Sequence, residues 1–199
     1  MIDLPAFADP VGEAQSCFRA VLDAMSRPGT LHAVGAGLTP PAPLDPATAA
    51  VLLTLVDGET ALAMDGAFAS AAPWIAFHCG TAPDAPAATA EFVLAAALPV
   101  LAGLSSGTDE QPESSATIIL QVAALGRGRE YAIAGPGLER PARFAAEGLP
   151  ADFVARWAAN HALYPRGIDL ILCAGTTLAA LPRSLRVAAE PRDPTTTEG

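Results

Sequence analysis

The segment Tyr164-Pro-Arg-Gly-Ile-Asp-Leu-Ile-Leu172 constrains the fold of this chain more than any other segment. Pro165 fixes its own φ and disfavours helical backbone at Tyr164, so a preceding helix must end there. Gly167 then permits a turn that a side chain would hinder. The run that follows is apolar except for Asp169, as expected for a buried strand of a sheet. The segment therefore predicts a helix, a turn and a buried strand in direct succession.

Asp169 is the unusual residue of that strand, because a buried carboxylate is costly unless it is paired or hydrogen-bonded. Arg166 is the nearest cation in the sequence. We therefore predict that Arg166 and Asp169 form a structural ion pair, since no nucleophile or metal-ligand pattern accompanies them. Replacement of Asp169 by alanine is expected to lower stability before it affects any specific activity.

Caps, periodicity and turn residues predict alternating helices and strands along most of the chain. The expected helices cover residues 9–26, 45–56, 67–75 and 149–161. The expected strands cover residues 30–34, 60–64, 90–95, 116–125, 130–134, 168–174, 177–181 and 185–189, with 126–128 as a hairpin turn between two of them. This order predicts one α/β domain over residues 1–189, with a mixed β-sheet flanked by helices and a disordered polar tail at 190–199.

Charge and hydropathy exclude several classes of partner. The net charge of −10 argues against binding to nucleic acid or to an anionic membrane. The longest apolar run has thirteen residues, 92–104, whereas a membrane span needs about 20. The N-terminus has no basic region followed by an apolar stretch, as a signal peptide would have. Cys17, Cys79 and Cys173 are odd in number, widely spaced and in apolar surroundings, which is typical of reduced thiols in a core. We therefore expect a cytoplasmic protein.

All eleven cationic side chains are arginine, and the chain contains no lysine. Without lysine, neither a pyridoxal phosphate Schiff base nor a Walker A loop can form. His32, His78 and His161 are far apart, and none has the close spacing of metal ligands. The sequence predicts no cofactor and no metal.

A serine hydrolase is one alternative function. Gly103-Leu-Ser-Ser-Gly107 has the letters of a nucleophile elbow, and Asp152 and His161 follow in hydrolase order. An elbow must lie between a strand and a helix, whereas here a polar loop follows. A catalytic Ser105 is therefore the weaker interpretation.

Three arginines at turns, Arg27, Arg166 and Arg183, suggest a phosphate- or phosphonate-binding module or a contact with a partner protein. Arginine binds phosphate and carboxylate groups through two parallel hydrogen bonds. The structural alternative is that Arg166 and Arg183 pair with Asp169 or cap helix carbonyls, because buried acids require such partners.

Six blocks of sequence, in a constant order, resemble the PhnH family, whose members are components of the bacterial carbon–phosphorus lyase complex. They are residues 18–29, 51–60, 77–83, 104–108, 112–122 and 164–172, and the last leads to Leu181-Pro-Arg-Ser184. The resemblance runs from about Phe7 to Val187, nearly the whole chain.

The resemblance implies a role in organic phosphonate catabolism. Members of this family act with sister subunits to attach an alkylphosphonate to the ribose of a nucleoside triphosphate, with loss of the purine base. They form homodimers, assemble with the other core subunits, and have a fold similar to that of pyridoxal-phosphate-dependent transferases without the cofactor. No catalytic residue is carried over from the family, so we expect a non-catalytic subunit.

Overall fold

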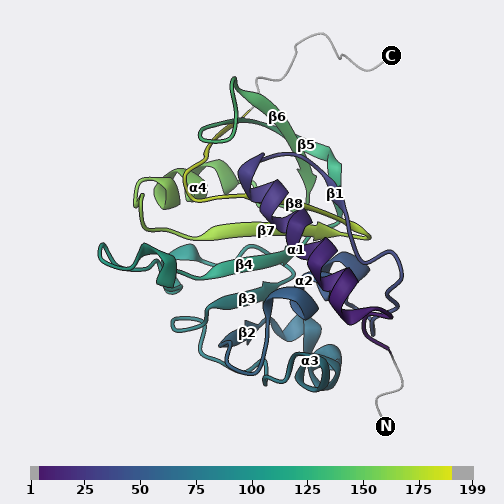
Figure 1. Cartoon of the computed structure of the whole chain (residues 1–199). Helices are drawn as coiled ribbons and strands as arrows, with labels where there is room; N and C mark the ends of the chain where they lie inside the picture. Colours follow the sequence, from purple (N-terminus) through teal and green to yellow (C-terminus); the bar gives the residue numbers. More distant parts are fainter. Residues whose placement is uncertain (1–4, 190–199) are drawn as a thin grey trace.

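A computed structural model describes residues 5–189 of the chain, so the tail predicted at 190–199 lies outside the described residues. A six-stranded sheet lies at its centre (Figure 1). Its strands in spatial order are β1 (His32–Ala33), β8 (Thr177–Leu181), β7 (Asp169–Ala174), β4 (Thr117–Gln121), β3 (Phe92–Ala95) and β2 (Leu62–Met64). The neighbours from β7 to β2 are parallel, whereas β8 is antiparallel to both β7 and β1. The mixed sheet predicted from the sequence is confirmed.

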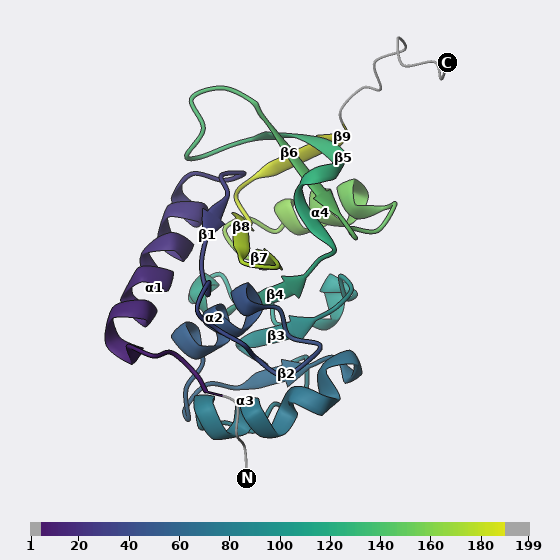
Figure 2. The same ribbon diagram turned by 90° about the vertical axis from the view of Figure 1, so that its right-hand side faces the viewer.

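Helices cover one face of this sheet, and a second sheet with one helix covers the other. The first layer contains α1 (Pro10–Ser26), α2 (Pro46–Leu55), the 3-10 helix η1 (Gly66–Ala71) and α3 (Ala72–Cys79). The second layer contains α4 (Phe153–His161) and the antiparallel strands β6 (Ala142–Glu147), β5 (Ala124–Ala134) and β9 (Arg186–Ala189). Figure 2 shows α1 and α4 on opposite sides of the sheet.

Alternation along the central strands divides the core in two. Ile119 and Ile171 pack towards α1, α2 and α3, whereas their neighbours Ile118 and Leu170 pack towards the second sheet. Successive side chains of a strand point to opposite faces, so a strand buried on both faces must be apolar throughout. The central strands β4 and β7 meet this condition.

The start of α1 is where local sequence and structure agree best. Asp9 is the N-cap, and its side chain accepts a hydrogen bond from the Gly12 amide at 3.1 Å. Glu13 reaches back and accepts from the Asp9 amide at 2.8 Å. These two bonds satisfy amides that the first turn of a helix leaves without a partner. The predicted helix start is confirmed.

The hairpin predicted around residues 126–128 is wrong. β5 continues through Gly126 and Gly128, whose φ values of 75° and 94° accompany a register shift between Leu125 and Arg129. These glycines form a bulge within one strand. Their left-handed backbone shifts the pairing register but does not reverse the direction of the chain. β4 instead has β3 and β7 as its neighbours and does not pair with β5.

Two further strands differ from expectation. Residues 185–189 were expected to complete the central sheet, but β9 pairs with β5 in the second sheet. β6 was not predicted at all, because its sequence Ala-Arg-Phe-Ala-Ala-Glu has only one large apolar residue. The helix expected at 67–75 is a 3-10 turn followed by α3, which begins at Ala72 and ends at Cys79.

Candidate functional site

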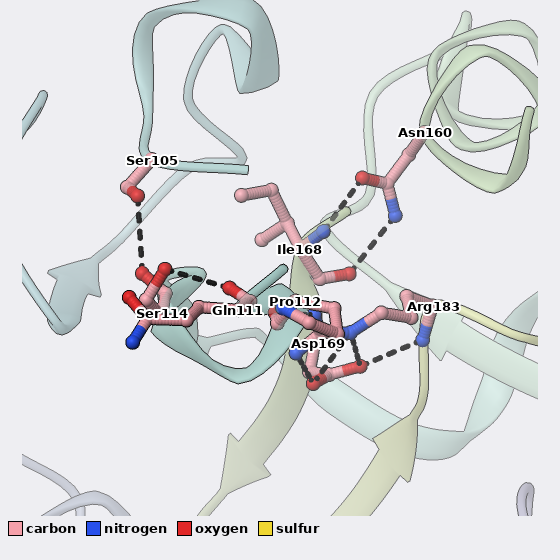
Figure 3. A network of polar contacts seen from close by, with 8 residues as sticks. All are labelled: Ser105, Gln111, Pro112, Ser114, Asn160, Ile168, Asp169 and Arg183. Atoms are coloured by element: carbon pink, nitrogen blue, oxygen red, sulfur yellow. Dashed lines mark hydrogen bonds and ion pairs between the residues drawn. The ribbon is translucent and has the colours of Figure 1, made fainter. Parts of the chain in front are cut away.

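Asp169 and Arg183 form the central ion pair of a polar network at the amino ends of β4 and β7 (Figure 3). The backbone amide of Arg183 donates to Asp169 Oδ1 at 2.7 Å. The side-chain Nε of Arg183 lies 3.1 Å from both oxygens of the same carboxylate. Arg183 Nη2 donates to Oδ2, and Nη1 donates to the carbonyl of Pro112 at 2.6 Å. The two side chains are only 15% and 19% exposed, so this pair is shielded from water.

The predicted Arg166–Asp169 pair is therefore wrong, and the predicted alternative, Arg183 with Asp169, is confirmed. β8 runs antiparallel to β7, with Leu181 opposite Leu170, so the residues that follow β8 return to the beginning of β7. Arg166 instead lies 3.0 Å from the carboxylate of Asp109, through its Nε and without hydrogen-bond geometry. This second pair is more open, with side chains 37% and 80% exposed.

The three predicted arginines do not share one set of contacts. Arg166 and Arg183 both contact the segment between η2 (Leu101–Gly103) and β4, at Asp109 and Pro112 respectively. Arg27 is the C-cap of α1, and its Nη2 lies 2.8 Å from Asp23 Oδ2 one turn earlier. The structure thus brings two of the arginines to one loop and places the third at the end of α1.

Asn160 is a structural residue of this network that the sequence analysis missed. Its side chain is buried, donates to the Ile168 carbonyl at 2.9 Å and accepts from the Ile168 amide at 2.8 Å (Figure 3). The Gly167 amide donates to the Ser106 carbonyl at 2.9 Å. These bonds connect the end of α4 and the loop at Ser106 to the two residues that precede β7. A signal was present, because Asn160 follows Trp157 and Phe153 on the apolar face of α4.

The serine hydrolase constellation is not assembled. Ser105 Oγ donates to the Ser114 carbonyl at 3.1 Å (Figure 3), whereas His161 Nδ1 contacts the Arg183 carbonyl at 3.1 Å. Asp152 accepts from Arg156 Nε at 2.8 Å. A nucleophile and its base must be within hydrogen-bond reach of one another, and here each has a separate partner. Ser105 lies in a loop, which is not the strand-to-helix turn of a nucleophile elbow.

The opposite, carboxyl ends of the parallel strands are where open α/β sheets usually bind ligands. Gln121 ends β4 there, and its Oε1 accepts from the Asp45 amide and from Thr48 Oγ1, each at 2.8 Å. Its Nε2 donates to the Pro43 carbonyl at 2.8 Å. Asp45 in turn accepts from the Gly175 amide at 2.8 Å. The polar groups of Gln121 and Gly175 at this edge are therefore hydrogen-bonded to residues at or near the start of α2.

Metal-ligand clusters and reactive thiols are absent from the described part of the chain. Within residues 5–189, no three His, Cys, Asp or Glu side chains are placed to hold a metal ion. Burial raises the pKa of the Cys17 and Cys173 thiols, and raises that of Cys79 to about 12. Thiols with such pKa values stay protonated at neutral pH and are poor nucleophiles. Among the helices of the same residues, none is long and apolar enough to cross a membrane.

The fold and the site together define a mixed α/β protein whose polar side chains at both ends of its parallel strands are mostly bonded within the chain. The chain belongs to the PhnH family, since the family described as "Bacterial phosphonate metabolism protein (PhnH)" matches residues 5–188. The resemblance predicted from six blocks of sequence is therefore confirmed.

Two relatives extend this comparison. The chain is 42% identical over 191 residues to "Alpha-D-ribose 1-methylphosphonate 5-triphosphate synthase subunit PhnH" of Rhizobium meliloti (strain 1021), which covers 93% of this chain and 95% of that protein. It is 31% identical over 182 residues to "Putative C-P lyase subunit protein HtxG" of Stutzerimonas stutzeri, with 87% and 85% covered. Both similarities extend over most of each protein.

Proposed function

We propose that this chain is a subunit of a bacterial carbon–phosphorus lyase core assembly. In this role it supports the transfer of an alkylphosphonate to the ribose of a nucleoside triphosphate. The observation that carries the proposal is the 42% identity to a named synthase subunit over nearly the full length of both chains. The subunit acts in the cytoplasm and works through contacts with sister subunits.

The contacts at the candidate site support a non-catalytic role. Asp169, Arg183 and Asn160 serve the fold, and Ser105 has no base beside it. An exposed apolar stripe on α1 supports a role in assembly, because Val11, Phe18 and Leu22 are 67%, 46% and 51% exposed. Apolar side chains gathered on a surface are typical of protein contacts.

Native co-purification tests the assembly directly. The chain, expressed with a tag at its natural level, is expected to recover the other core subunits, identified by mass spectrometry. A reconstituted assembly supplied with ATP and methylphosphonate is expected to form the ribosyl triphosphate product only when this chain is included. Product formation by the isolated chain alone would contradict the non-catalytic role.

Arg27 and Arg166 are proposed partner or phosphate contacts, since their side chains are 59% and 37% exposed. Arg183 has a supporting part in this proposal, because it holds the loop at Pro112 beside Arg166. Arg27→Gln and Arg166→Gln are expected to weaken recovery of the sister subunits, with Arg127→Gln, at a side chain on β5 that is 74% exposed, as the control. Undiminished recovery with both variants would argue against these contacts.

Two finer features implied by the family belong to the same proposal. The chain forms a homodimer, which light scattering coupled to size-exclusion chromatography tests through a mass of twice 20.1 kDa. Its fold is that of pyridoxal-phosphate-dependent transferases without the cofactor, in keeping with the absence of lysine. An unchanged absorption spectrum after incubation with pyridoxal phosphate is the expected result of the second test.

A further inference from the structure

A cleft of about 530 Å³ lies where the second sheet meets α4. Its apolar lining includes Ala132 and Ala134 of β5, Ala188 of β9 and Ala158 of α4, and its polar groups are those of His161 and Arg186. Ligand pockets in proteins commonly have about 300–1,000 Å³ and a mostly apolar lining with a few polar groups. The cleft has the size and the composition of such a pocket.

The alternation of the strands explains why small side chains line this cleft. Tyr131 and Ile133 of β5 are buried in the core, so Ala132 and Ala134 between and beyond them point to the outer face. In the pairing of β5 with β9, Ala132 is opposite Ala188 and Ala134 is opposite Arg186. Where β5 pairs with β9, the outer face of this sheet therefore has small apolar side chains, and Arg186 lies beside them at the beginning of β9.

Two hydrogen bonds from α4 fix the wall of the cleft. Trp157 Nε1 donates to the Leu185 carbonyl at 2.8 Å, and one helical turn later His161 Nδ1 contacts the Arg183 carbonyl at 3.1 Å. A carbonyl oxygen only accepts, so Nδ1 of His161 must carry its proton. The second ring nitrogen, Nε2, is without a hydrogen-bond partner among residues 5–189. The ring is thus held in place with one polar atom available.

Arg186 differs from most other arginines of the described chain. Six of them make ion pairs with acidic side chains, namely Arg27, Arg127, Arg143, Arg156, Arg166 and Arg183. Arg186 is exposed, and its side chain makes no ion pair or hydrogen bond within the described residues. A guanidinium group binds carboxylate, phosphate and phosphonate groups through two parallel hydrogen bonds. An unpaired guanidinium and an imidazole nitrogen therefore lie together at an apolar cleft.

We propose that this cleft binds a small amphiphilic anion, namely an organic molecule with an apolar body and one carboxylate, phosphate or phosphonate group. The apolar body lies on Ala132, Ala134 and Ala188. The anionic group binds the guanidinium of Arg186, and the unprotonated Nε2 of His161 accepts a hydrogen bond from a ligand hydroxyl group such as a P–OH. This binding site goes beyond the proposed function and does not depend on it, because the isolated chain contains all of these groups.

The apolar part is required because one surface guanidinium is a weak site by itself. An exposed pair of opposite charges contributes only about 0–1 kcal/mol, since water screens both partners. Burial of an apolar body contributes about 25 cal/mol per Å² of surface removed from water. A ring laid on the alanine methyl groups therefore adds affinity that inorganic phosphate, which is fully hydrated, does not gain.

Isothermal titration calorimetry of the full-length chain at pH 7 and low salt tests this site. The probes are phenylphosphonate, phenyl phosphate and benzoate, which share the apolar ring and differ in the anionic group, together with inorganic phosphate. We expect saturable one-to-one binding of at least one aromatic anion, at least tenfold tighter than that of inorganic phosphate. Equal affinity for inorganic phosphate, or no saturable binding of any aromatic anion, would overturn the proposal.

Two variants locate the binding at this cleft. Arg186→Gln is expected to weaken the binding of the tightest-binding aromatic anion at least tenfold. Arg19→Gln, which removes an exposed charge from α1, is expected to change that affinity less than twofold. Ala188→Leu places a larger side chain on the exposed floor of the cleft and is expected to abolish binding. Unchanged affinity in Arg186→Gln or in Ala188→Leu would place the binding elsewhere and overturn the proposal.

Discussion

Arg183 and Arg186 are three residues apart, yet they lie in two regions with opposite character. Arg183 is 15% exposed, and its guanidinium is bonded to Asp169 and to the carbonyl of Pro112. Arg186 is exposed, lines a cleft and makes no ion pair within the described residues. One region is a closed network at the amino ends of the central strands, and the other is an open surface on the second sheet.

The difference shows how to distinguish a charge that serves the fold from one available to a ligand. In the closed network each guanidinium nitrogen of Arg183 already has an acceptor, so binding an anion there would require breaking bonds within a shielded ion pair. Removal of one partner from such a pair is costly, because the other charge remains desolvated. At the open surface the guanidinium exchanges only water for a ligand. The two regions should therefore respond to mutation in opposite ways.

The largest expected effect is on the closed network. Asp169→Ala leaves the guanidinium of Arg183 shielded and without its carboxylate, and should lower the free energy of unfolding by about 3–5 kcal/mol. Urea unfolding followed by circular dichroism measures this loss. Asp169→Asn, which keeps an oxygen to accept from the Arg183 amide, should lose less. An unchanged unfolding midpoint in Asp169→Ala would show that the network does not stabilise the fold.

The second effect concerns the side-chain amide of Asn160, which connects α4 to the residue before β7. Asn160→Ala removes a buried side chain that bonds both the amide and the carbonyl of Ile168. Leaving a buried backbone group without a partner costs about 1–3 kcal/mol, and two groups are affected here, so a loss of at least about 2 kcal/mol is expected from thermal or urea unfolding. Ala159→Ser, at the exposed neighbouring position, is the control and should change little. Equal stability of the two variants would contradict the role of Asn160.

Local signals were sufficient where a structure depends on neighbours in sequence. The start of α1 was predicted from cap signals near residue 9, because a helix cap is made by residues within one turn. The apolar run of β7 likewise predicted burial on both faces. Mixed α/β architecture followed from the alternation of such elements.

Long-range pairing could not be predicted in the same way. β4 lies between β3 and β7, residues distant in sequence, so its proximity to β5 along the chain was misleading. The partner of Asp169 is fourteen residues away because β8 returns antiparallel to β7, a direction that no residue near Asp169 encodes. Arg186 was overlooked for a related reason, since its cleft exists only after α4 has packed beside β9.

A smaller effect is expected at the more open ion pair beside the closed network. Asp109→Ala removes a carboxylate that is 80% exposed and pairs with Arg166. Exposed ion pairs contribute about 0–1 kcal/mol, so the free energy of unfolding should fall by less than about 1 kcal/mol. A double-mutant cycle with Arg166→Ala measures the coupling between the two side chains. A coupling as large as that of Asp169 with Arg183 would remove the distinction between shielded and open pairs.

The smallest effect on stability is expected at Arg186, where the contrast with Arg183 is most direct. Arg186→Gln removes an exposed charge without an ion-pair partner in the described chain, so the free energy of unfolding should change by no more than about 0.5 kcal/mol. Arg183→Gln makes the same chemical change but leaves Asp169 shielded and without its guanidinium, and should cost about 3 kcal/mol or more. Urea unfolding of the two variants under one set of conditions gives both values. A similar loss in both would mean that Arg186 also serves the fold, and its guanidinium would then be an unsuitable ligand group for the cleft.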